Sequence, residues 1–142
     1  MLTVLRQLLA VVLGFAAGSA VNMGLVLVGG RLVPPPAGTD VSTMEGLAAA
    51  LPLFEPKHFL FPFLAHALGT LAGAVAAGLL AAGRSAAPAY SVGVLFLGSG
   101  IANVAMLPGP VWFNAIDVVL AYLPMAWLGQ KLVQHLRPSI ER

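Results

Sequence analysis

The sequence predicts an all-α integral membrane protein, a bundle of four transmembrane helices with a short outer interfacial helix between the first two. Of its 142 residues, 59% are hydrophobic and only 8% are charged, whereas soluble domains carry roughly 25% charged residues. Four apolar stretches are each long enough to cross a bilayer, which takes about 20 helical residues. Prolines stand at the start of three of these stretches, as expected for helix N-termini.

The four spans are separated by one substantial loop and two short connections. We expect them at residues 2–33, 59–82, 89–107 and 111–133. Pro62 falls in the first turn of the second span, and Pro88 and Pro110 directly precede the third and fourth, where a missing N–H costs little. The first span is too long for a signal peptide, whose apolar region covers about 7–15 residues. We therefore expect a single integral membrane domain over residues 1–142.

The loop between the first two spans, residues 34–58, predicts a short surface helix. It opens with the stiff, non-helical stretch PPPAGTD. Ser42 and Glu45 then stand at capping-box spacing, and Pro52 ends the run. The apolar residues that recur at helical spacing between them are Met44, Leu47, Ala48 and Leu51. We expect this helix to lie with its apolar side on the bundle or on the lipid headgroups.

The distribution of lysine and arginine predicts that both termini are cytoplasmic. The outer side holds Arg31 and Lys57, accompanied by the acidic residues Asp40, Glu45 and Glu55. The basic residues on the side of the termini and the second connection are Arg6, Arg84, Lys131, Arg137 and Arg142.

Polar side chains within the spans share a depth, which predicts a common pocket. At 1.5 Å of rise per residue, three of them lie about 6 to 10 Å from the outer ends of their spans: His66, Asn103 and Asp117. Asn22 lies somewhat deeper, and all four fall in the outer half. The residues predicted to line this polar pocket are His66, Asp117, Asn22, Asn103, Thr70 and Asn114.

Small-residue stripes predict close contacts between helices. Gly14 and Gly18 form a GxxxG in the first span, and Gly69 and Gly73 do so in the second. His66 precedes the latter pair by three and seven residues, so it projects from the same helical face. We therefore expect His66 to face protein and not lipid.

The pairing of His66 with Asp117 allows two interpretations. A neutral imidazole donating to Asp117 or to a backbone carbonyl would simply hold helices together. Alternatively, the two residues form a proton-carrying or ligand-binding pair, because an ionisable residue at membrane depth is commonly functional. Asn22 and Asn103 are expected mainly to form hydrogen bonds between helices.

Several function classes are disfavoured by the composition. The net charge of +2 comes from seven basic and five acidic residues spread thinly along the chain, so there is no basic stripe for nucleic acid. There are no cysteines, and the three histidines are too dispersed for the converging ligands that a metal needs. We predict no catalytic residue, no metal and no cofactor.

Four segments carry a resemblance: PPPAGTD, AHALGTLAGAVAA, GIANVAMLPGPVWF and DVVLAYLPMAWLG. Together they resemble a group of small four-helix bacterial inner-membrane proteins of uncharacterised function. The resemblance covers most of the chain and implies the same topology and a multi-pass location in the bacterial inner membrane. It implies no reaction or substrate.

The favoured hypothesis is a non-enzymatic membrane protein, in contact with membrane lipids, that associates with itself or serves as an accessory subunit of a larger membrane complex. Two alternatives use the outer pocket differently. A small proton-linked carrier would use Asp117 and His66 as its titrating pair, although only Pro124 suggests the broken helix common in transporters. A membrane enzyme that binds a lipid or quinone would use the same pair as acid and base.

Overall fold

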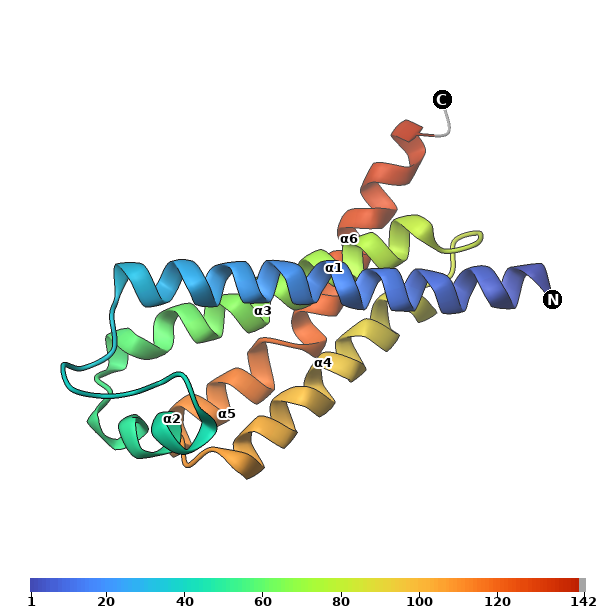
Figure 1. Ribbon diagram of the computed structural model, residues 1–142. Helices are drawn as coiled ribbons and strands as arrows, with labels where there is room; N and C mark the ends of the chain where they lie inside the picture. Colours follow the sequence, from blue (N-terminus) through green and yellow to red (C-terminus); the bar gives the residue numbers. More distant parts are fainter. Residues whose placement is uncertain (141–142) are drawn as a thin grey trace.

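The computed structural model describes the backbone of residues 1–140 and the side chains of residues 1–137, and within this range it contains helices and no strand (Figure 1). This confirms the predicted all-helical fold. The helices are α1 Leu2–Leu32, α2 Met44–Ala50, α3 Leu60–Leu80, α4 Ala87–Met106, α5 Val111–Leu120 and α6 Leu123–Ile140. Arg142, counted above for orientation, lies outside the described residues.

Four stretches are long and apolar enough to cross a membrane, and they correspond to the four predicted spans. They are Leu2–Leu32, Pro56–Leu80, Ala87–Met106 and Val111–Arg137. The chain therefore has the character of a multi-pass membrane protein.

Helix α3 occupies the centre of the fold and packs against α1, α4, α5 and α6. The N-terminus, the C-terminal end of α6 and the α3–α4 connection lie towards one end of the molecule, which we call the terminal end (Figure 1). Helix α2 and the α4–α5 turn lie at the opposite end, the α2 end. Since α4 runs away from α1 towards the α2 end, the long helices diverge there.

The crossing of α1 and α3 depends on the predicted glycines. A Cβ added to Gly18 would lie 2.5 Å from the carbonyl oxygen of Gly69, and one added to Gly73 would lie 2.8 Å from that of Gly14. These distances are far below van der Waals contact, so no larger residue fits without shifting the helices. Asn22 lies at the same crossing, because a Cβ on Gly69 would be 3.0 Å from its Cβ.

The C-terminus of α3 is held by arginines from two other helices. Arg6 Nε donates to the carbonyl oxygen of Leu80 at 3.0 Å, and Arg137 Nη2 donates to those of Gly78 at 2.8 Å and Ala81 at 3.0 Å. The last carbonyls of a helix have no intrahelical partner, and cations are favourable beside them. Two of the basic residues used to predict orientation thus also stabilise the fold.

The predicted surface helix is present as α2 and continues into a 3₁₀ turn, Leu51–Leu53. Its predicted cap is wrong, because Thr43 and not Ser42 caps it: the Thr43 hydroxyl accepts from the Gly46 N–H at 3.0 Å. Ser42 instead binds Asp40: its hydroxyl and its backbone N–H donate to Asp40 Oδ1 at 2.6 and 2.9 Å. These hydrogen bonds lower the pKa of Asp40.

The fourth predicted span, 111–133, is not a single helix. Helix α5 ends at Leu120 and α6 begins at Leu123, with a bend at Ala121 and Tyr122 between them. Pro124 explains the break, because it has no N–H for the carbonyl of residue 120 and its ring clashes there. Helix α6 also extends beyond the predicted end, to Ile140.

Gly18→Ala is expected to destabilise the protein by about 1–3 kcal/mol, since the added methyl group overpacks a backbone contact. The matched control is Gly24→Ala in the same helix, where an added Cβ meets nothing within 4 Å. This control should be neutral or stabilising, because alanine is the better helix former by about 1 kcal/mol. Thermal unfolding in a mild detergent measures both, and an equal effect of the two substitutions would contradict the crossing described here.

Candidate functional site

Asp117 on α5 is the centre of a buried polar cluster. The residue is 3% exposed. His66 Nδ1 on α3 lies 2.9 Å from each carboxylate oxygen, and the Tyr122 hydroxyl donates to Oδ2 at 2.7 Å. A buried carboxylate is costly unless it is paired and hydrogen-bonded, and these two donors meet that need. The predicted approach of His66 to Asp117 is therefore present.

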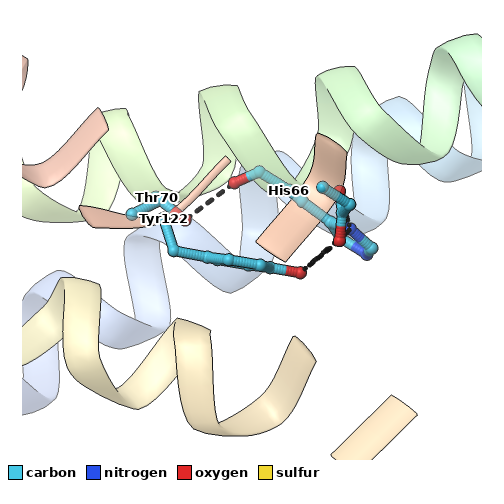
Figure 2. A network of polar contacts seen from close by, with 4 residues as sticks. His66, Thr70 and Tyr122 are labelled. Atoms are coloured by element: carbon cyan, nitrogen blue, oxygen red, sulfur yellow. Dashed lines mark hydrogen bonds and ion pairs between the residues drawn. The ribbon is translucent and has the colours of Figure 1, made fainter. Parts of the chain in front are cut away.

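Both the backbone and the ring of His66 make contacts within this cluster (Figure 2). Its backbone carbonyl accepts from the Thr70 hydroxyl one turn further along α3, at 2.7 Å. Its imidazole stacks on the Tyr122 ring with centroids 5.8 Å apart and an interplanar angle of 30°. Thr70 was predicted to line the pocket, but it is fully buried and its hydroxyl donates to a backbone carbonyl of its own helix.

Tyr122 is the member of the cluster that the sequence did not reveal. In a continuous helix, residues five apart point about 140° away from each other, so Asp117 and Tyr122 would face different sides. The bend at Ala121 and Tyr122 brings them together. Gly100 on α4 provides the space, because an added Cβ there would collide with the Tyr122 hydroxyl. The sequence contained one signal for this contact, Pro124, because a proline within a helical stretch marks a break in the helix.

A cavity of about 340 Å³ opens beside this cluster at the α2 end. Its walls are mainly apolar and come from α1, the α2 segment, α3, α4 and the start of α5. Representative wall residues are Val26, Leu47, Leu51, Phe59, Phe61, Val104, Leu107 and Phe113. The polar lining residues are His58, His66, Asn103, Asn114 and Asp117.

The structure brings together most of the predicted pocket residues, but not all of them. Asn103 and Asn114 line the cavity, and Asn114 donates to the carbonyl of Gly109 at 3.2 Å. Asn22 does not line it, because its position packs against Gly69 at the crossing of α1 and α3. Depth, together with the four-residue spacing of Gly14, Gly18 and Asn22, placed Asn22 near the pocket, whereas in the structure that face packs against α3 at the crossing.

Within the cluster, His66 is the accessible group. Its side chain is 19% exposed, against 1% for Tyr122. Since Nδ1 faces Asp117 and Tyr122, the remaining ring nitrogen, Nε2, is the atom available to a molecule in the cavity. Among the described residues, no three His, Asp or Glu side chains converge as metal ligands would.

Comparison of the chain with protein-family models, curated proteins and solved structures finds no significant match. The resemblance to small bacterial inner-membrane proteins therefore stays a prediction.

Tyr122→Phe is expected to lower stability by about 1–2 kcal/mol, because it removes one of two donors from a buried carboxylate while keeping the ring. Tyr90→Phe is the control, since Tyr90 is exposed on α4. Thermal unfolding of both variants in the same detergent measures the difference. Equal stability of the two would mean that the Tyr122 hydroxyl contributes nothing to holding Asp117.

Proposed function

We propose that this chain is a small multi-pass membrane protein that binds a lipid-like molecule in the cavity at its α2 end, and that it acts as a binding component and not as an enzyme. One observation carries the proposal. The cavity has apolar walls and a single partly exposed imidazole, His66, beside its buried carboxylate. This combination suits a molecule with a long apolar body and a small hydrogen-bonding head.

The size and lining of the cavity support this function. Ligand pockets commonly measure about 300–1,000 Å³, with apolar walls and a few polar groups that fix orientation. Burying an apolar chain against such walls gains about 25 cal/mol per Å². A head group that then reaches His66 would satisfy the remaining ring nitrogen.

The location follows the sequence-based expectation. We propose that the chain lies in the bacterial inner membrane with its termini in the cytoplasm, so that the α2 end faces outward. The predicted association with itself or with a larger membrane complex stays a prediction. The exposed apolar face of α1, which includes Leu8, Val12 and Leu27, is equally compatible with contact to lipid and with contact to a neighbouring helix.

A cavity-filling substitution tests the proposal. Val104 and Val94 are both exposed residues of α4, but only Val104 lines the cavity. In protein purified from membranes in a mild detergent, Val104→Trp should reduce stoichiometrically bound lipid at least ten-fold, measured by quantitative mass spectrometry of extracted lipids. Val94→Trp should leave it unchanged. The proposal would be refuted if the unaltered protein contained no bound lipid, or if Val104→Trp retained as much bound lipid as the unaltered protein.

A proton-linked carrier is the second candidate, and the broken fourth span is the observation that favours it. Discontinuous helices form the binding sites of many transporters, and here α5 ends at Leu120, about one helical turn after the ionisable residue Asp117.

Under this second function, Asp117→Asn should abolish solute-induced charge movement, because the pair could no longer exchange a proton. The measurement is electrophysiology on a solid-supported membrane with proteoliposomes and a panel of small solutes. Glu45→Gln is the control, since Glu45 is exposed on α2. Charge movement that persists in Asp117→Asn would exclude a carrier that works through this carboxylate.

A further inference from the structure

We propose that the cavity selects an uncharged lipid whose head carries a hydroxyl group, and that this hydroxyl donates its hydrogen to Nε2 of His66. The inference rests on the proposed lipid-binding function and adds the chemical class of the head group. Three features of the cavity support it: the tautomer of His66, the tautomer of His58 and the absence of basic side chains from the lining.

The partners of His66 determine which of its nitrogens carries the hydrogen. An ionised carboxylate can only accept hydrogen bonds, and Asp117 lies 2.9 Å from Nδ1 through both of its oxygens. The hydrogen of the neutral ring therefore lies on Nδ1, and Nε2 is left with a lone pair. No described residue forms a hydrogen bond with Nε2 of His66, so a ligand must supply a donor.

His58, in the 3₁₀ turn Pro56–Phe59 that leads into α3, is held in the opposite tautomer. The backbone N–H of Glu55 donates to its Nδ1 at 2.9 Å. The same Nδ1 also lies 3.2 Å from the Glu55 carbonyl oxygen, but that oxygen already accepts from the His58 N–H at 2.9 Å. Because the backbone N–H of Glu55 can only donate and makes the shorter contact, we assign the lone pair to Nδ1 and the ring hydrogen to Nε2. His58 also lines the cavity. The two histidines thus offer one acceptor, at His66, and one donor, at His58, beside the amides of Asn103 and Asn114. All of these groups are uncharged, which suits the donor and acceptor functions of a neutral hydroxylated head.

Charged heads are disfavoured by the surroundings of His66. Neither lysine nor arginine is found among the described residues that line the cavity, so a phosphate or carboxylate would enter without a counter-charge and beside Asp117. An ammonium head carries three donors and no acceptor, which leaves the His58 N–H unused and requires desolvation of a full charge. A hydroxyl group carries no charge, so it needs no counter-charge, and it can both donate to His66 and accept from His58.

A series of probes with one shared oleyl chain tests the head group. The probes are oleyl alcohol, oleyl methyl ether, oleyl phosphate and oleylamine, measured by native mass spectrometry of the protein released from detergent. Oleyl alcohol should bind at least ten-fold more tightly than the methyl ether, in which a methyl group replaces the hydroxyl hydrogen, and more tightly than both charged probes. Equal binding of alcohol and ether, or preference for a charged head, would overturn the inference.

The test also separates this inference from the proposed function. If all four probes bind alike and Val104→Trp abolishes their binding, the cavity binds lipids but does not select the hydroxyl. If no probe binds, the proposed function itself fails. His66→Phe should reduce the alcohol-to-ether ratio to about one, while His135→Phe, which alters an exposed histidine on α6, should preserve it.

A second measurement applies even if His66→Phe does not fold. In protein labelled with ¹⁵N-histidine, long-range proton–nitrogen correlation spectra distinguish the two neutral tautomers and the imidazolium. We expect the hydrogen on Nδ1 in His66 and on Nε2 in His58. A hydrogen on Nε2 of His66, in either the neutral or the charged ring, would remove the acceptor and overturn the inference.

Discussion

The buried carboxylate of Asp117 needs hydrogen-bond donors, and this need connects the helices at the α2 end. A charged group 3% exposed in an apolar helix is tolerated only when donors surround it. One donor, His66, comes from α3, and the other, Tyr122, comes from the bend that precedes α6. The relative positions of α3, α5 and α6 are therefore coupled through a single side chain.

Two other features allow those donors to reach the carboxylate. The break before Pro124 turns Tyr122 towards Asp117, and Gly100 on α4 leaves room for its hydroxyl. Helix α3 is itself fixed elsewhere, by the glycine contacts with α1 and by the arginines that bind its last carbonyls. Close packing in the middle of α3 and hydrogen bonds at its C-terminus thus hold in place the helix that presents His66 near its N-terminus.

The sequence predicted the parts of this arrangement that depend on helical periodicity. Depth and face together were sufficient to pair His66 with Asp117 and to place Gly69 and Gly73 at a close crossing, because both arguments hold along an unbroken helix. They failed for Asn22, because the face that it shares with Gly14 and Gly18 packs against α3 and does not reach the cavity. They also failed for Tyr122, whose contact exists only because the helix is interrupted. A proline marks such a break, but not the direction in which the chain leaves it.

The divergence of the helices towards the α2 end (Figure 1) explains why the polar cluster borders a cavity and is not sealed in a core. Asp117 then has two roles, because the same carboxylate that joins α3 to α5 also fixes the hydrogen of His66 on Nδ1 and leaves Nε2 as an acceptor. Stability and ligand choice are consequently inseparable at Asp117, whereas the cavity walls, at Val104 for example, can be altered without disturbing the carboxylate. Under the proposed function, selectivity for the head group therefore depends on the residues that bind the far side of the His66 ring, and selectivity for the apolar chain depends on the cavity walls.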